Sequence, residues 1–248
     1  MYRTLQAEKI IDTTRKLRSR VQERFPDSSL LKVTQELVAI AEEASARCRS
    51  FRTPNLGLRV MVTAFLLSGV TAIILLFTQV HISESMWNIE NFLEEFNAAL
   101  GIVVFIGMAV AFLMTLEIRI KRRRVLNAIN ELRALAHIVD MHQLTKDPEF
   151  ILRTGPSTPS SPIRNMSSFE LSRYFDYCSE LLALTAKIAA LYVQDFPDPV
   201  VLNAVDDVEE VTSNLSHKIW QKITLLDRFA EREEELNRLR GATTGGNS

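Results

Sequence analysis

Residues 60–83 read VMVTAFLLSGVTAIILLFTQVHIS and residues 97–116 read NAALGIVVFIGMAVAFLMTL, and neither stretch contains a charged residue. A helix needs about 20 consecutive apolar residues to cross the roughly 30 Å hydrocarbon core of a bilayer. Both stretches meet this requirement. The sequence therefore predicts two transmembrane helices, at residues 58–80 and 98–118, and the lipid bilayer as the partner of this hairpin.

The charges that flank the two stretches predict their orientation. Arginines come before the first stretch and a basic cluster follows the second, whereas the connecting loop contains four glutamates and neither Lys nor Arg. By the positive-inside rule, both termini face the cytoplasm and the loop lies outside. We expect a multi-pass protein of the cell inner (cytoplasmic) membrane. The residues are Arg47, Arg49, Arg52 and Arg59 before the first stretch, and Glu84, Glu90, Glu94 and Glu95 in the loop.

The basic cluster consists of Arg119, Lys121, Arg122, Arg123 and Arg124. A basic run directly inside a membrane span fixes topology and attracts anionic lipid headgroups. A nucleic-acid or nuclear-localisation patch is the alternative, but the position of the cluster and the net charge of -1 disfavour it. We therefore expect anionic lipid near these five residues and no nucleic-acid partner.

The loop at 81–97 is short and amphipathic. Its apolar residues recur at helical spacing, and Trp87 is an aromatic of the kind that lies at the headgroup level. The loop is predicted to form a short interfacial helix, and it is too small for a folded sensory domain.

Small residues recur four apart in both predicted spans, as Ser68 with Ala72 and Gly107 with Ala111. Such pairs allow close approach of helix backbones in lipid. They indicate either a contact between the two spans, a contact between protomers, or the ordinary composition of transmembrane helices.

The rest of the chain is predicted to be all-α, because apolar residues recur at helical spacing and no alternating strand pattern is present. Residues 1–53 form a cytoplasmic αα-hairpin that turns at Phe25-Pro26-Asp27, with Asp27 or Ser28 capping the second helix. All eight prolines fall where the apolar pattern breaks, namely Pro26, Pro54, Pro148, Pro156, Pro159, Pro162, Pro197 and Pro199.

The second transmembrane helix is predicted to continue into a cytoplasmic helix at 119–147, since no helix-breaking residue separates them. A Pro/Ser-rich linker at 148–167 follows. Ser167-x-x-Glu170 has the form of a capping box and begins a second cytoplasmic αα-hairpin at 168–240. This hairpin turns at residues 196–199, where Asp198 is the expected N-cap and Pro199 the first helical residue. Its Glu- and Arg-rich end resembles a coiled coil, and a disordered tail is expected at 241–248.

The two hairpins match in pattern when one is shifted by 171 residues, which superposes their Phe-Pro-Asp turns. Thr14 then meets Thr185 and Leu37 meets Val208. The match indicates either an internal repeat or chance convergence on one kind of turn. If the hairpins pack together, they form a four-helix bundle with the membrane hairpin inserted into it and the 119–147 helix docked alongside. Pairing of hairpins between protomers is the alternative.

No catalytic, cofactor-binding or metal-binding residue is predicted. The glycine positions exclude phosphate-binding loops, and the chain contains neither GxSxG nor HExxH. His137 and His142 are five residues apart, so they do not converge on one ion. Cys48 and Cys178 have no partner at metal-ligand spacing and are expected to be buried apolar residues.

Three functions fit this architecture. The first is a non-enzymatic integral membrane scaffold or adaptor, whose cytoplasmic helices bind a partner protein or self-associate. The second is an oligomeric channel or pore-forming effector, with the hydroxyls of the first span facing a central path; these are Thr63, Ser68, Thr71 and Thr78. The third is a transmembrane signal relay through the helix that follows the second span.

Overall fold

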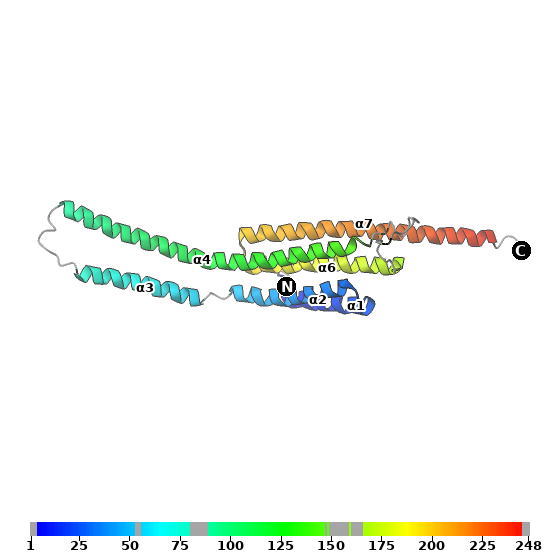
Figure 1. Ribbon diagram of the computed structural model, residues 1–248, viewed down its shortest axis with the longest axis horizontal. Helices are drawn as coiled ribbons and strands as arrows, with labels where there is room; N and C mark the ends of the chain where they lie inside the picture. The colour runs from blue at the N-terminus through cyan, green and yellow to red at the C-terminus, as the bar shows by residue number, and fades with distance from the viewer. Residues whose placement is uncertain are drawn as a thin grey trace. The chain divides into compact units, whose positions relative to one another are not determined.

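The computed structural model describes residues 4–52, 56–79, 89–146, 148, 159 and 166–244. The described residues are all-helical and contain no strand. Two compact units can be distinguished, one made of Met1–Ser50 with Val125–Ser248, and the other of Phe51–Arg124. The first unit, the bundle, is therefore built from two parts of the chain that the second unit separates. The helices are α1 (Ala7–Arg24), α2 (Ser29–Arg52), α3 (Leu56–Gln79), α4 (Ile89–Gln143), α6 (Ser168–Asp195) and α7 (Pro199–Thr244) (Figure 1).

The bundle consists of α1, α2, the part of α4 from Val125 onward, α6 and α7. α6 packs against both α1 and α7. It buries neighbouring residues that point in different directions, such as Leu181, Leu182 and Leu184, because other helices surround it. α2 contacts α6 through the Cys48 thiol, which donates to the Leu191 carbonyl at 3.7 Å.

Ion pairs join the outer surfaces of neighbouring helices in the bundle. Exposed pairs of this kind contribute about 0–1 kcal/mol each, so they orient helices whose packing is stabilised by the apolar core. The pairs are Arg15–Glu42 between α1 and α2 at 2.6 Å, Arg47–Glu131 between α2 and α4 at 3.2 Å, and Arg133–Asp207 between α4 and α7 at 3.5 Å.

The two hairpins α1–α2 and α6–α7 turn in the same way. Phe25 follows α1 with φ -134° and ψ 62°, and Phe196 follows α6 with φ -141° and ψ 81°. The backbone N–H of each phenylalanine donates to the carbonyl four residues earlier, at 2.7 Å and 2.9 Å respectively. The shift of 171 residues that superposes the turns in sequence thus also superposes their backbone geometry.

The buried positions of the two hairpins follow the same shift. Every buried residue of α1 has a buried counterpart in α6, and the threonine in each set donates its hydroxyl to the carbonyl four residues earlier at 2.8 Å. The bundle of the structure forms within one chain. The matched positions are Ile10 with Leu181, Thr14 with Thr185, Leu17 with Ile188, and Val21 with Tyr192.

Both helices of the second hairpin begin directly after their predicted N-cap residues, Ser167 and Asp198. Ser167 accepts a hydrogen bond from the Glu170 N–H at 3.2 Å, and Glu170 accepts one from the Ser167 N–H at 2.8 Å, so the predicted capping box is confirmed. Asp198 Oδ1 accepts from the Val200 N–H at 3.0 Å, which confirms this N-cap. In the first hairpin Ser28, not Asp27, accepts from the Leu31 N–H at 3.2 Å.

Two helices extend further than the sequence indicated. Residues 89–97, expected as part of a separate loop helix, are the first turns of α4, since no Pro or Gly separates them from residue 98. α7 continues through Gly241 to Thr244, and no described glycine adopts the positive φ typical of a helix end. The rest of the predicted loop, most of the 148–167 linker and residues 245–248 lie outside the described residues.

Candidate interaction surfaces

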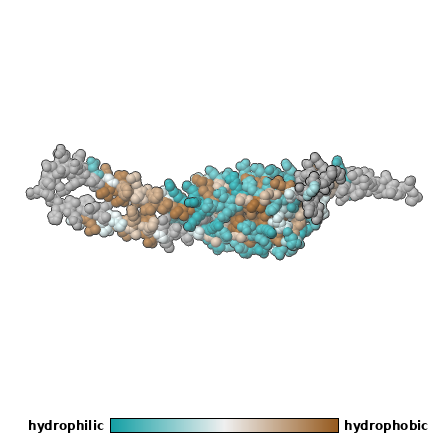
Figure 2. Space-filling model, viewed as in Figure 1, coloured by the Kyte–Doolittle hydropathy of each residue, from teal (hydrophilic) through white to brown (hydrophobic). Residues whose placement is uncertain are grey.

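The unit of residues 51–124 exposes a long apolar surface. In the described chain, one helix is long and apolar enough to cross a membrane, the Leu100–Gln143 part of α4, whose most apolar window has mean hydropathy 2.3 and no buried residue. α3 contains a shorter apolar stretch at Val60–Thr71. Figure 2 shows these helices as mostly hydrophobic where they are coloured, whereas the surface of the bundle is mostly hydrophilic with some hydrophobic patches. Large exposed side chains include Val60, Met61, Phe65, Leu67, Val70, Ile74 and Leu75 in α3, and Leu100, Val103, Phe105, Met108 and Phe112 in α4.

The hydroxyl groups of α3 donate hydrogen bonds within their own helix. Thr63, Ser68 and Thr78 donate to the carbonyl three residues earlier, at 3.0, 2.9 and 2.9 Å. Thr71 donates to the Leu67 carbonyl at 2.8 Å. Because each donor is satisfied by the backbone, these side chains do not require a polar path beside the helix.

Among the described glycines of the second unit, one lies close to the neighbouring helix. A Cβ added at Gly69 of α3 would lie 3.9 Å from Ile106 Cδ1 of α4, whereas a Cβ added at Gly101 or Gly107 would meet nothing within 4 Å. In the structure, Gly69 and not Gly107 thus lies at the contact between α3 and α4.

The basic cluster occupies consecutive turns of α4. Arg119, Arg123 and Arg124 are exposed, and Lys121 and Arg122 are partly buried. Lys121 pairs with Glu117 one turn earlier at 2.9 Å. The cluster therefore presents at least three guanidinium groups to solvent, which suits it to anionic headgroups.

A groove of about 640 Å³, here called the basic–aromatic groove, runs between α1, α6 and α7. Two of its aromatic side chains are unusually exposed for their size, Phe169 at 58% and Trp220 at 61%. Tyr177 and Ile223 form a buried floor. Its cationic residues are Arg20 and Arg24 of α1 and Arg173 of α6, and its acidic residues are Asp176 and Glu180.

Electrostatic contacts hold the side chains of this groove in place. The guanidinium groups of Arg24 and Arg173 lie 5.3 Å and 5.6 Å from the centre of the Phe169 ring. Arg20 forms a two-point ion pair with Glu180, which raises the pKa of the arginine. Arg173 pairs with Asp176 at 3.2 Å. A phenylalanine exposed between two arginines is an arrangement that binding surfaces use, since it offers an apolar face and charge together.

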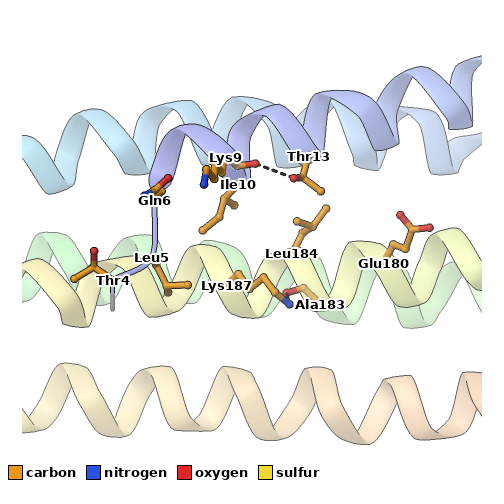
Figure 3. Close-up of a pocket in the computed structure, with 10 residues that line it drawn as sticks. All are labelled: Thr4, Leu5, Gln6, Lys9, Ile10, Thr13, Glu180, Ala183, Leu184 and Lys187. Atoms are coloured by element: carbon orange, nitrogen blue, oxygen red, sulfur yellow. Dashed lines mark hydrogen bonds between the residues drawn. The ribbon is translucent and has the colours of Figure 1, made fainter. Parts of the chain in front are cut away.

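A second groove of about 430 Å³ lies between the start of α1 and α6 (Figure 3). Leu5, Ile10 and Leu184 project into it, and Lys9, Lys187 and Glu180 lie along its edges. The segment before α1 is fixed by Gln194, whose side-chain amide accepts from the Leu5 N–H at 2.8 Å and donates to the Leu5 carbonyl at 3.3 Å.

A cluster of polar groups is buried where α4, α6 and α7 meet. Cys178 and Tyr174 are fully buried, and burial raises the pKa of the Cys178 thiol to about 12 and also raises the pKa of Tyr174. Tyr174 and Gln143 lie beside the thiol, and the Tyr174 hydroxyl and Gln143 Nε2 are buried without a hydrogen-bond partner among the described residues. Lys222 donates to the Gln143 carbonyl at 3.4 Å. Desolvation thus keeps the thiol protonated, as expected of a structural cysteine.

The histidines that the structure describes do not assemble a site with other ligand residues. His137 is exposed, whereas His142 lies 3.3 Å from Ser29 Oγ, and desolvation lowers the pKa of His142. Within the described residues no group of three or more His, Cys, Asp or Glu is placed to hold a metal ion. Cys48 and Cys178 are both buried, and neither forms a disulfide bond.

Comparisons with protein-family models, with curated proteins and with solved structures found no match to this chain. The surfaces must therefore be interpreted from their own chemistry. The basic–aromatic groove did not emerge from the sequence, because its residues come from three helices far apart in the chain. Of the groove residues, Trp220 alone could have indicated a surface site from the sequence. It lies on the polar face of an amphipathic helix, where a tryptophan does not pack in the core.

Proposed function

We propose that the protein is a non-enzymatic membrane scaffold, anchored by α3 and α4, whose helical bundle binds protein. The observation that carries this proposal is the contrast between the two units. The bundle buries most of its apolar residues in a core, whereas none of the apolar residues of the 51–124 unit whose side chains are described is buried, and most of them are exposed. Apolar patches far larger than a few hundred Å² are rare on soluble monomers and indicate contact with lipid or protein.

We infer that α3 spans the bilayer as well as α4. Its 24 residues extend about 36 Å at 1.5 Å per residue, which exceeds the hydrocarbon thickness. The uncharged sequence from residue 60 to residue 83 supports this assignment. With two spans, the arginines before α3 and the basic cluster of α4 lie on one side, so both termini are cytoplasmic and the basic cluster meets anionic headgroups.

Protein binding is the role that the bundle surface supports. It carries a groove with exposed aromatic and arginine side chains, the residue types enriched in protein interfaces. Stacking of Arg24 and Arg173 on Phe169 pre-organises these side chains, which lowers the entropy lost on binding.

The membrane arrangement can be tested by cysteine labelling in intact cells. In a background with Cys48→Ala and Cys178→Ala, Ser85→Cys lies in the predicted outer loop and Ser213→Cys on the exposed surface of α7. A membrane-impermeant maleimide should label Ser85→Cys in intact cells and Ser213→Cys only after permeabilisation. Equal labelling of both before permeabilisation, or release of the protein by alkaline carbonate, would refute the two-span anchor.

The binding role is tested separately by photo-crosslinking from the groove. A photoreactive amino acid in place of Trp220 should give discrete crosslinked protein species, and the same substitution at exposed Asn214 is the matched control. Crosslinks of equal yield from both positions would contradict a specific binding surface at the groove.

A further inference from the structure

The three arginines that line the basic–aromatic groove already interact with acidic residues of the same chain. A charged ligand would therefore have to displace one of these contacts, and exchanging one exposed ion pair for another gains little free energy. An uncharged ligand leaves the contacts intact and fits the groove better. The contacts join Arg20 to Glu180, Arg173 to Asp176 at 3.2 Å, and Arg24 to Glu170.

The apolar surface of the groove is aromatic and open to solvent. Phe169 and Trp220 are 58% and 61% exposed, and Tyr177 and Ile223 form the floor. Grooves lined by aromatic side chains are the surfaces on which proline-rich peptides dock. The exposed rings of this groove therefore favour a ligand that contains proline.

Hydrogen-bond donors accompany the rings. Each guanidinium carries five N–H groups, of which a paired carboxylate uses only some, and the indole N–H of Trp220 is a further donor. A peptide in the polyproline II conformation has no internal hydrogen bonds, so its backbone carbonyls are free to accept from these groups. A helical ligand has already used most of its carbonyls within its own helix and would gain less.

The length of the groove agrees with a short extended ligand. Its lining residues on α6 run from Phe169 to Ala183, which is about 21 Å at 1.5 Å per residue. At a rise of about 3.1 Å per residue, roughly seven residues of a polyproline II helix cover this distance. Because this helix has about three residues per turn, prolines at every third position lie along one edge and face the groove together.

We propose that the basic–aromatic groove binds an uncharged, proline-rich segment of a partner protein in the polyproline II conformation. The proline rings lie against Trp220 and Phe169, and the backbone carbonyls accept hydrogen bonds from the arginines. The chain itself contains a sequence of this type, PSTPSSP at residues 156–162. Pro159 of this sequence is exposed and does not line the groove, so the groove stays open to a partner. This inference names the class of partner for the protein-binding role proposed above and rests on that role.

The test is the binding of decaproline to the full-length protein in nanodiscs. With Trp87→Phe, Trp220 is the sole tryptophan, and its emission should shift to shorter wavelengths in a saturable manner as decaproline binds. A flexible decapeptide of alternating Gly and Ser should leave the emission unchanged. Raising NaCl from about 50 to about 500 mM should change the Kd by less than about two-fold, because net charge does not select the ligand. A Kd that rises ten-fold with salt would overturn the proposal, as would the absence of a saturable shift.

Substitutions in the groove provide a second measurement, the anisotropy of fluorescently labelled decaproline. Phe169→Ala and Trp220→Ala should each weaken binding at least about ten-fold, since each removes an exposed ring that contacts the ligand. Leu202→Ala is the matched control, because Leu202 is 46% exposed near the start of α7, outside the groove. An unchanged Kd in both groove variants would contradict the assigned site.

Two further outcomes separate this inference from the proposed function. If decaproline binds only after Pro156, Pro159 and Pro162 are replaced by Ala, the chain's own segment is the occupant and a partner is not. If the photoreactive group at position 220 gives discrete crosslinked proteins but decaproline does not bind, the protein-binding role stands and the partner belongs to another class. Failure of both experiments would remove the protein-binding role as well.

Discussion

Cys178 combines complete burial with two nearby ammonium groups, those of Lys146 and Lys222, and the effect of burial dominates. Desolvation raises the pKa of the thiol from 9.0 to about 12, although both lysines act in the opposite direction. Between pH 9 and about pH 12, the Cys178 thiol is therefore deprotonated in the unfolded chain and still protonated in the folded chain. Stability must therefore decrease as pH rises above about 9.

The substitution Cys178→Ala tests this argument. The free energy of unfolding of the wild type should fall more steeply than that of the variant above pH 9, by about 1.4 kcal/mol for each pH unit. Urea unfolding in detergent at pH 8, 9.5 and 10.5 measures the two slopes. Parallel slopes would show that the thiol ionises equally in both states. Below pH 9 the slopes should not differ.

At the scale of an element, equivalent positions of the two hairpin turns use different caps. Asp198 is buried and accepts from the N–H groups of Val200 and Val201 at 3.0 and 3.4 Å, whereas Asp27, its counterpart, is exposed. Ser28 caps α2 instead and also donates to the Phe25 carbonyl at 2.8 Å. Two turns with the same sequence pattern and backbone geometry thus depend on different side chains.

Removing these caps should therefore give unequal results. Asp198→Ala and Ser28→Ala should each cost about 1 kcal/mol of stability, because each leaves a helix N–H without its partner. Asp27→Ala should change stability by less than about 0.5 kcal/mol, since it is an exposed substitution. Thermal unfolding followed by circular dichroism compares the three variants. A loss at Asp27→Ala equal to that at Asp198→Ala would contradict the assigned caps.

Local sequence signals predicted the helices of the hairpins and the caps at Ser167 and Asp198, because capping depends on residues within one turn. Helix ends without a capping or helix-breaking residue were harder to predict. α4 begins earlier than predicted, at Ile89, and α7 ends later than predicted, at Thr244. The basic–aromatic groove was not predictable, since Arg24, Phe169 and Trp220 become neighbours only after three helices pack. The helical periodicity of the apolar residues was enough to predict an all-helical fold, whereas the candidate groove could be recognised only from the tertiary structure.

At the scale of the whole molecule, the bundle is closed by two segments that lie on either side of residues 51–124. Arg47 near the end of α2 pairs with Glu131 of α4 at 3.2 Å, so the two points where the chain leaves and re-enters the bundle are close together. A short linker can therefore join Ser50 to Val125 without opening the bundle. The apolar residues of α3 and the first part of α4 take no part in the core of the bundle.

These observations predict that the bundle folds without the 51–124 unit. A chain in which a short Gly/Ser linker replaces residues 51–124 should be soluble without detergent, strongly helical by circular dichroism, and should unfold in one cooperative transition. Leu181→Asp in the same shortened chain is the control, because a charge at this fully buried position should abolish the transition. An insoluble shortened chain, or one without cooperative unfolding, would show that the 51–124 unit is needed for folding as well as for attachment to the membrane.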